Sequence, residues 1–386
     1  MKARLDAQVV SVTDGSALKT ALMTKRVLVC VGSGGVGKTT VSATLALRAA
    51  AEGRSALVCT IDPARRLANS LGLAKLGNTE AAVPESQWTD AGLTPRAPLY
   101  AMMVDMKQSW DELITRYAAP DKREKIFQNR FYKALSTALA GSQEYIALEK
   151  LWQLRTQRDY QLIVLDTPPT AHALDFLDAP NRILDFLDND AAKWLLTPAM
   201  AAGKVGLQLF NLGGSFIAKT LSRLTGAQTL QELASFMLAI SSMNKEFRER
   251  AKAVRELLAS DQTAFVLVTG TSAERQDEAI HFLELLRQNK MAVAALVVNR
   301  IHPAPSAESF AAARTLDGDL RQRVEETLNE AHLLAEQDAA GVEVLREKAG
   351  GAPILEVPRF DLDVHDLKGL WKTSEYLTGA AHVPLP

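Results

Sequence analysis

A glycine-rich run near the amino end constrains this chain more than any other feature. Residues 32–39 read GSGGVGKT, directly after an apolar segment and directly before a helix-like one. The run has the form G-x-x-x-x-G-K-[ST], whose backbone N–H groups turn inward around phosphate oxygens and whose glycines leave room for that approach. Lys38 would place a positive charge on the β- and γ-phosphates, and Thr39 would offer its hydroxyl to Mg²⁺. The sequence therefore predicts a nucleoside triphosphate site.

Short apolar runs without alternation recur along the chain between longer helix-like segments. Such runs are typical of strands buried on both faces, and their alternation with helices indicates βαβ units and a mostly parallel sheet. A helix is expected at Thr39–Glu52, between the first two runs. The runs are Arg26–Val31, Ser55–Ile61, Pro98–Val104, Tyr160–Asp166, Thr263–Thr269, Ala292–Asn299 and Ala352–Pro358.

Two regions, residues 105–158 and 181–260, are helical in pattern and almost free of strand-like runs. The simplest organisation is an N-terminal extension at 1–25 and one sheet domain at 26–386, whose two helical insertions form a second lobe. In the second insertion, apolar residues at steps of three and four, with one polar break at Asn244, predict a helix with a single apolar stripe. The stripe is Leu230, Leu233, Met237, Ile240, Phe247, Ala251, Val254 and Leu258.

Charge and cysteine content exclude several classes of protein. The 44 Lys and Arg against 45 Asp and Glu leave a net charge of −1, so no nucleic-acid partner is expected. Cys30 and Cys59 both lie in apolar runs, which argues against a disulfide scaffold or a multi-cysteine metal site. The start lacks a signal-peptide pattern, and the longest uncharged stretch, Val205–Ala218, is too short to span a membrane. We expect a soluble cytoplasmic protein.

Two aspartates that follow strand-like runs are candidates to serve the phosphate loop. Asp166 ends a strongly hydrophobic run, where a Walker B carboxylate can reach the Mg²⁺ shell. Asp62 beside the γ-phosphate could orient or deprotonate the attacking water. Because Pro63 follows it, Asp62 could also be the N-cap of a helix at Ala64–Leu71, and the two roles are compatible.

Asn299 ends another strand-like run and suggests which base is bound. The sequence from Asn299 to His302 is NRIH, without the aspartate of Asn-Lys-x-Asp that would accept from guanine, so adenine is favoured. His302 and His172 have no companion histidines at metal-ligand spacing. We expect both histidines to make local structural hydrogen bonds.

Together these segments resemble the anion-transporting ATPase family, which includes arsenical-pump-driving and tail-anchored-protein-targeting ATPases. The family's deviant Walker A loop, KGGVGKT, is matched by SGGVGKT at 33–39. Its two switch segments, DPAH and DTAPTGH, are matched by DPAR at 62–65 and DTPPTAH at 166–172. Its later VVNR/K and VPxFD segments resemble VVNR at 297–300 and VPRFD at 357–361. The segments occur in the family's order.

The resemblance implies an α/β fold, a doubly wound and mostly parallel P-loop NTPase sheet with a helical insertion subdomain. It implies a Mg²⁺-dependent ATPase that works as a nucleotide-gated dimer, so this chain would need a second copy or a paralogous ATPase subunit. Lys38 and Asp62 would be catalytic, and Thr39 and Asp166 would hold the metal. The ATP site would comprise Gly34, Gly35, Val36, Gly37, Lys38, Thr39, Thr40, Asn299, Pro358 and Phe360.

The chain departs from the family pattern at three points. The signature lysine, which reaches across the dimer to the other subunit's phosphates, is Ser33 here, and a hydroxyl cannot supply that charge. Arg65 or Arg66 could serve as an arginine finger instead, or a partner chain could bring the lysine. The zinc-binding C-x-x-C and the arsenite-binding cysteines are both absent. Metalloid pumping by that chemistry is therefore not expected.

The segment Trp194–Leu224 is apolar nearly all round, which is unusual for a helical region outside a membrane. By the resemblance it would form a groove for a hydrophobic client helix or membrane-protein partner, and a lid packed on its own lobe is the alternative. Two other functions stay open. A ParA/MinD-like positioning ATPase would need a basic face, whereas Asp361–Pro386 is mixed in charge. A nucleotide-binding scaffold or regulatory subunit with weak hydrolysis is made credible by Ser33.

Overall fold

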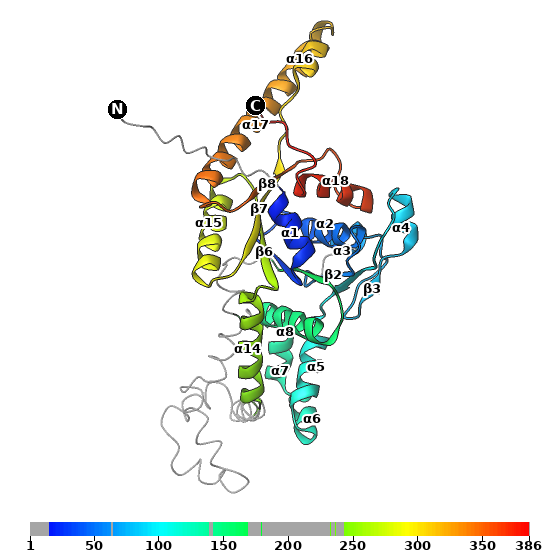
Figure 1. The fold of residues 1–386 in the computed structure, drawn as a ribbon, viewed down its shortest axis with the longest axis vertical. Coiled ribbons are helices and arrows are strands. Elements are labelled where there is room, and N and C mark those ends of the chain that lie inside the picture. The colour runs from blue at the N-terminus through cyan, green and yellow to red at the C-terminus, as the bar shows by residue number, and fades with distance from the viewer. Residues whose placement is uncertain are drawn as a thin grey trace, which may run out of the picture. The chain divides into compact units, whose positions relative to one another are not determined.

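The computed structural model describes four stretches of the chain, at residues 15–62, 65–138, 142–168 and 243–385, and the single positions 179, 232 and 236. The chain divides into two compact units (Figure 1). The first, which we call the sheet unit, comprises residues 1–102, 159–173 and 259–386. The second, the helical unit, comprises residues 103–158 and 174–258.

In the described residues, eight strands form one sheet in the order β3-β4-β2-β5-β1-β6-β7-β8. From β2 to β8 along this order the neighbouring strands pair in parallel, whereas β3 is antiparallel to β4. The strands are β1 Val27–Val31, β2 Ala56–Thr60, β3 Ala81–Ala82, β4 Leu99–Met103, β5 Leu162–Asp166, β6 Thr263–Thr269, β7 Val293–Ile301 and β8 Ile354–Pro358. The α/β class and the mostly parallel sheet expected from the sequence are confirmed.

All seven strand-like runs form strands, with ends that differ from the expected ones by at most two residues. The agreement has a physical cause: every residue of β1, β2, β5 and β6 is buried, so each position selects an apolar or uncharged side chain until the strand ends. The two-residue strand β3 was not predicted, because two residues are too few to show a pattern.

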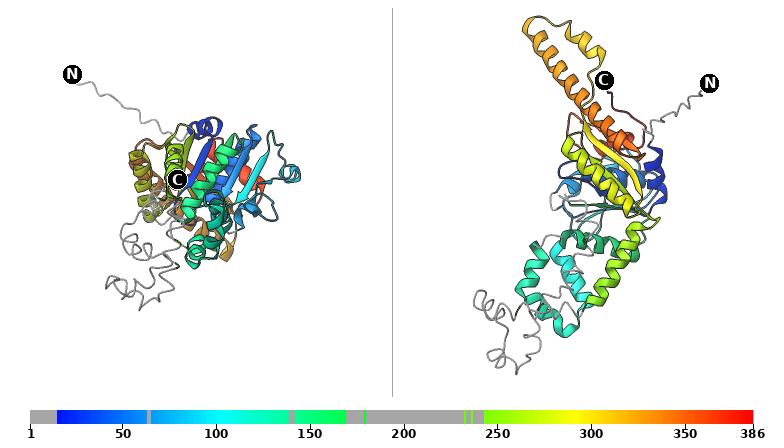
Figure 2. Two further views of the ribbon diagram at one scale, coloured as in Figure 1. Left: turned by 90° about the horizontal axis from the view of Figure 1, so that it is seen from below. Right: turned by 90° about the vertical axis from the view of Figure 1, so that its left-hand side faces the viewer.

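Helices cover both faces of the sheet. α2 packs on β1, β2 and β5 and against α18, whereas α15 and α17 pack together on the other side of β6 and β7 (Figure 1; Figure 2, right). The helices of this unit are α1 Ser16–Thr24, α2 Lys38–Ala51, α3 Arg66–Ser70, α4 Glu85–Asp90, α15 Ala273–Gln288, α16 Ala307–Ala313, α17 Gly318–Lys348 and α18 Leu367–Leu377. α1 lies within the stretch 1–25 and buries Leu18, Ala21 and Leu22.

The order of the strands determines where the phosphate loop lies. β1 is between β5 and β6, and the chain runs from β1 to β2 on one side and from β6 to β8 on the other. Ligands in open α/β sheets bind at the carboxyl ends of the strands, where the strand order switches direction. Residues that follow β1, β2, β5 and β7 therefore meet at one edge. Cys30 pairs with Asp166 in the register, one residue before the end of β1.

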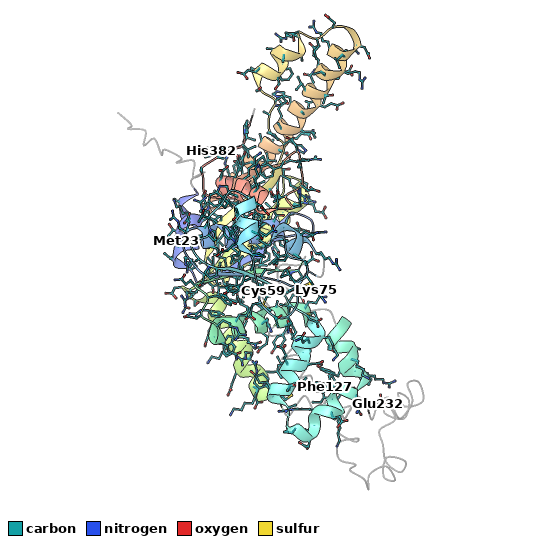
Figure 3. The ribbon with its side chains drawn as sticks, turned by 90° about the vertical axis from the view of Figure 1, so that its right-hand side faces the viewer. Met23, Cys59, Lys75, Phe127, Glu232 and His382 are labelled. Carbon is teal, nitrogen blue, oxygen red and sulfur yellow. The ribbon has the colours of Figure 1, made fainter. Side chains whose placement is uncertain are left out.

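Both cysteines are core residues, as their apolar sequence context predicts. Cys30 in β1 and Cys59 in β2 are completely buried (Figure 3 labels Cys59). Burial raises the pKa of the Cys30 thiol to about 12, so it stays neutral. A buried neutral thiol behaves as a small apolar side chain.

α17 is a 31-residue helix that the sequence analysis did not single out. Its buried residues, Ala335, Asp338, Gly341, Val342 and Leu345, all lie in its carboxyl half. The amino half extends beyond the sheet with α16 beside it (Figure 2, right), and Leu320 and Leu333 are more than half exposed there.

The helical unit confirms part of the predicted apolar stripe. Its described helices are α5 Met106–Tyr117, α6 Pro120–Gln128, α7 Arg130–Ala138, α8 Ser142–Gln157 and α14 Asn244–Ala259. α14 begins at Asn244, and its apolar residues Phe247, Ala251, Val254 and Leu258 are all buried. The other four stripe residues, Leu230, Leu233, Met237 and Ile240, lie outside the described residues, as do the segments 194–224 and 205–218 and His172.

We find no helix in the described stretches that has both the length and the apolar character needed to cross a lipid bilayer.

Candidate nucleotide-binding site

The glycine-rich loop has backbone conformations that residues with a side chain rarely adopt. Gly32, Gly35 and Gly37 have φ angles of 148°, 76° and 97°, all in the left-handed range that favours glycine. A Cβ on Gly32 would overlap the carbonyl oxygen of Val268, and a Cβ on Gly37 would overlap the side-chain amide of Asn299. Glycine is therefore required at 32 and 37 by both conformation and space. Gly34 and Gly35, at the tip of the loop, are exposed.

Lys38 is the first residue of α2, and its side chain turns back over the loop. Its Nζ donates hydrogen bonds to the carbonyl oxygens of Gly32 and Ser33, each at 2.8 Å. The residue is only 7% exposed. Burial lowers the pKa of Lys38, and the nearby carboxylates of Asp166 and Asp62 act in the opposite direction. The loop thus encloses a cationic group, as anion binding requires.

Asp166 ends β5 and accepts two hydroxyl hydrogen bonds on one oxygen. Thr39 Oγ1 donates to Asp166 Oδ2 at 2.7 Å, and Thr60 Oγ1 donates to the same atom at 2.8 Å. Burial raises the pKa of Asp166 to about 6, against the lowering effect of these two hydrogen bonds and of Lys38. The other oxygen, Oδ1, is buried and has no hydrogen-bond partner within the described residues.

Asp62 follows β2 and is connected to Asp166 through one hydroxyl. Its backbone N–H donates to Thr60 Oγ1 at 3.2 Å, and the same hydroxyl donates to Asp166. The prediction that Asp62 caps the next helix is wrong. α3 begins at Arg66, and Arg65 occupies its N-cap position. Arg66 lies 3.9 Å from Asp62 Oδ2, and Arg65 and Arg66 are both exposed.

Asn299 and Arg300, at the end of β7, contact the phosphate loop. Asn299 Nδ2 donates to the carbonyl oxygen of Val36 at 2.8 Å, and Arg300 donates from its guanidinium to the carbonyl oxygen of Gly35 at 3.2 Å. The sequence analysis suggested Asn299 as a base contact and did not predict that it touches the loop. Arg300 appeared there only as part of the family motif.

Pro358 and Phe360, the other two suggested base contacts, lie at the end of β8. Pro358 is buried and pairs with Ile301 of β7. The Phe360 ring lies 5.9 Å from the Tyr376 ring and 5.0 Å from Lys372 Nζ, so it packs on α18. Both residues are thus on the β7–β8 side of the loop.

His302 makes the local structural hydrogen bonds that the sequence predicted for it. Its backbone N–H and its Nδ1 both contact Asp338 Oδ2, at 2.8 and 2.7 Å, and its Nε2 lies 3.0 Å from Arg359. Because arginine only donates, Nε2 accepts and the ring carries its proton on Nδ1. Thr271 also donates to Asp338. Asp338, on α17, therefore connects three segments of the sheet unit.

The structure brings the phosphate loop, Asp62, Asp166 and Asn299 together at one edge of the sheet. The sequence analysis gave no individual role to four residues that the structure places here: Thr60, Thr167, Arg300 and Asp338. Thr167 donates from Oγ1 to the carbonyl oxygen of Cys30 at 2.8 Å and so ties β5 to β1. A polar residue at the end of an otherwise apolar strand, as at Thr60, is the signal that could have found one of them.

Most of the chain matches one known protein family. The family described as "Anion-transporting ATPase" matches residues 25–350, which is most of the chain and includes the loop, both aspartates and Asn299. The chain belongs to the anion-transporting ATPase family. Pro358 and Phe360 lie beyond the matched residues.

Individual members of the anion-transporting ATPase family show moderate similarity. ATPase GET3B of Arabidopsis thaliana is 28% identical over 301 residues, which cover 72% of this chain and 64% of that protein. ATPase GET3 of Malassezia globosa is 27% identical over 285 residues, covering 72% of this chain and 74% of its own length. ATPase ARSA1 of Chlamydomonas reinhardtii is 25% identical over 306 residues, covering 72% of this chain and 35% of its own length.

Membership in the anion-transporting ATPase family assigns ATP hydrolysis to this chain. The eight-stranded sheet agrees with the P-loop NTPase fold that the resemblance implied.

Proposed function

We propose that this chain is a Mg²⁺-dependent ATPase that works as a nucleotide-gated dimer and that its hydrolysis reshapes a hydrophobic helical surface for a client or partner. The catalytic part of the proposal rests on one group of residues. The glycine loop surrounds Lys38, and the buried Asp166 beside it accepts a hydrogen bond from the Thr39 hydroxyl. The other steps follow from the residues around it.

ATP would bind with its phosphates in the loop and its base on the β7–β8 side. The loop N–H groups and the start of α2 favour anions because they present unpaired donors and the positive end of the helix dipole. The phosphate contacts would come from Gly34, Gly35, Val36, Gly37, Lys38, Thr39 and Thr40. The adenine contacts would come from Asn299, Pro358 and Phe360.

The residues at the loop fit a magnesium ion. Mg²⁺ takes oxygen ligands, and the buried Asp166 Oδ1 has no hydrogen-bond partner in the described residues, beside the hydroxyl of Thr39. Thr39 and Asp166 would hold the ion. When bound, it would neutralise charge on the β- and γ-phosphates. The rise in the pKa of Asp166 would be reversed by such a neighbouring cation.

Asp62 would orient or deprotonate the attacking water, and Arg65 or Arg66 could supply transition-state charge. The side chain of Asp62 is partly exposed at the end of β2, which suits a group that must reach both water and the γ-phosphate. Arg66, 3.9 Å away, is mostly exposed and could turn toward a bound phosphate or toward a second subunit. Arg65 is the proposed catalytic arginine because it belongs to the DPAR segment at 62–65, and Arg66 follows it directly.

A second copy of the chain or a paralogous subunit would complete the site. Ser33 cannot give the charge of the family's lysine, so a partner that carries this lysine is an alternative to the arginine finger. The client would be a hydrophobic helix or a membrane protein, because segment 194–224 is apolar nearly all round. We expect no nucleic-acid partner. A cytoplasmic location is part of the proposal and agrees with Cys30 and Cys59, which are buried and form no disulfide.

Ser33 also supports a second candidate function, a nucleotide-binding scaffold or regulatory subunit with weak hydrolysis. The two candidates share ATP binding and differ in turnover. A ParA/MinD-like positioning ATPase is the third possibility from the sequence, and the mixed charge of residues 361–386 counts against it.

The proposal is tested by ATP turnover of the purified full chain with Mg²⁺, alone and at concentrations that favour dimers. We expect Lys38→Ala to lower turnover by about 100-fold or more, the size found for loss of one transition-state charge contact. Lys75→Ala, which removes an exposed lysine elsewhere in the sheet unit (Figure 3), is the matched control. Turnover that is equal in wild type and Lys38→Ala would overturn the proposal.

The dimer is tested separately by light scattering with a non-hydrolysable ATP analogue. We expect the mass to double with the analogue and Mg²⁺ but not with ADP. Ser33→Lys should raise turnover if a second copy faces the γ-phosphate, because it restores a cross-subunit charge. Binding of ATP without any turnover, alone or with Ser33→Lys, would favour the scaffold.

A further inference from the structure

We propose that Arg300 is a positioning residue that holds the tip of the phosphate loop in its phosphate-binding conformation. This role rests on the proposed ATP site. It is carried by the bulge of β7, by the left-handed backbone of Arg300 and by the hydrogen bond from its guanidinium to Gly35.

The bulge leaves Arg300 outside the pairing of β7 with β8. In the register of β7 with β8, Asn299 pairs with Val357 and Ile301 pairs with Pro358, so Arg300 is the extra residue between them. A bulge leaves one residue unpaired and redirects its side chain, and bulges are frequent beside functional sites. Here the redirected side chain reaches the carbonyl oxygen of Gly35, 265 residues earlier in the chain.

The backbone of Arg300 is strained, and a neighbour maintains the strain. Its φ is 64°, in the left-handed region that residues with a Cβ rarely adopt. Its N–H donates to Asn299 Oδ1 at 3.0 Å, while Asn299 Nδ2 donates to the carbonyl oxygen of Val36. The Asn299 side chain thus ties the bulge to the loop on one side and fixes the peptide of Arg300 on the other. Strain that the surroundings maintain in this way is typical of functional positions.

The bonds from Asn299 and Arg300 orient two peptide groups of the loop. In a trans peptide the C=O and the following N–H point in opposite directions. The bond to the carbonyl of Gly35 therefore fixes the N–H of Val36 on the opposite side of that peptide, and the bond to the carbonyl of Val36 fixes the N–H of Gly37 in the same way. These are N–H groups that a phosphate loop presents to its ligand.

Arg300 matters because the tip of the loop has few other constraints. The carbonyls of Gly32 and Ser33 are held by Lys38, whose ammonium would turn to the phosphates when they bind. Gly34 and Gly35 are exposed and lack side chains that could pack. The hydrogen bonds that Asn299 and Arg300 donate from β7 would persist during ligand binding, and Arg300 donates the bond to the carbonyl oxygen of Gly35.

The test compares two glycine substitutions at left-handed positions. Lys290, in the turn between α15 and β7, has a φ of 57° and is exposed, so Lys290→Gly relieves similar strain and removes a similar charge away from the site. Calorimetry on the full chain would measure the dissociation constants of ATP and of inorganic tripolyphosphate, which has no base. We expect Arg300→Gly to weaken both probes equally, by about three- to tenfold, the effect of one net hydrogen bond, and Lys290→Gly to change neither.

Arg300→Lys keeps the charge and one donor, so it should restore part of the affinity for both probes. Equal affinity in Arg300→Gly and wild type would overturn the role. Loss of ATP affinity with unchanged tripolyphosphate affinity would also overturn it, because Arg300 would then contact the base. Failure of the wild-type chain to bind either probe would overturn the proposed function itself, which is a different result.

Discussion

The side-chain amide of Asn299 occupies the space in which a Cβ on Gly37 would have to lie. The same amide donates to the carbonyl oxygen of Val36. The last glycine of the phosphate loop is therefore required by a residue on another strand as well as by its own φ of 97°. The phosphate loop and the end of β7 therefore pack directly against each other.

Gly37→Ala should abolish measurable ATP binding, whereas Gly35→Ala should weaken it by about 1–3 kcal/mol at most. Both glycines have a positive φ, but a Cβ on Gly35 meets no atom within 4 Å. Gly35→Ala therefore introduces only backbone strain, whereas Gly37→Ala introduces backbone strain and a steric clash with Asn299. Calorimetric titration with ATP measures both. The added substitution Asn299→Ala should recover part of the binding lost in Gly37→Ala, and absence of any recovery would contradict the collision.

Thr60→Val should lower Mg²⁺-dependent turnover and destabilise the chain by about 1–3 kcal/mol, because it removes a hydrogen bond from a buried carboxylate. The hydroxyl of Thr60 also accepts from the N–H of Asp62, so both aspartates lose a common partner. Thr60→Ser keeps the hydroxyl and is the matched control. Turnover against magnesium concentration, together with urea unfolding, checks the prediction. A valine variant indistinguishable from the serine variant would contradict it.

We expect the contribution of Asp166 to the free energy of unfolding to decrease as the pH rises from about 4 to about 6. Burial raises the pKa of Asp166 in the folded chain to about 6, above its ordinary value of 3.8. Folding therefore favours the protonated form, so this contribution is complete below the ordinary pKa and is lost as the pH rises through the folded pKa. The shift corresponds to about 3 kcal/mol.

Asp166→Asn isolates this contribution, because the amide oxygen can still accept from Thr39 and Thr60. Urea unfolding with a chelator and without nucleotide, at about pH 4 and about pH 7, should show the pH-dependent loss in wild type and its reduction in the variant. A difference between wild type and variant that is the same at both pH values would contradict the assignment.

Asp338→Ala should destabilise the sheet unit by about 2–4 kcal/mol, because it removes the acceptor of Thr271 and of two N–H groups of His302. We also expect weaker ATP binding, since His302 accepts from Arg359 beside Pro358 and Phe360. Thermal unfolding and ATP titration measure the two effects. Glu336→Ala, at an exposed position on the same helix, is the control. A loss of stability no larger in Asp338→Ala than in this control would contradict the prediction.

The family and the sheet could be predicted from the sequence because their signals are local. The residues GSGGVGKT are contiguous, and a strand buried on both faces is uniformly apolar, so its limits are visible in the chain itself. The seven strands and α2 were found for this reason. The N-cap assignment of Asp62 was wrong because an Asp-Pro pair does not by itself specify where the following helix begins, and α3 begins at Arg66.

The sequence by itself determined a phosphate loop, a parallel sheet and two carboxylates at strand ends, because each of these depends on neighbouring residues. Only the tertiary structure decided that Thr60 joins Asp62 to Asp166, and that Asn299 and Arg300 hold the loop. Apart from the local bond between Asp62 and Thr60, those bonds connect residues 106 to 265 positions apart. They exist because the strand order places β2 and β1 on either side of β5 and brings β7 to the other side of β1, next to β6, an order that no local pattern records.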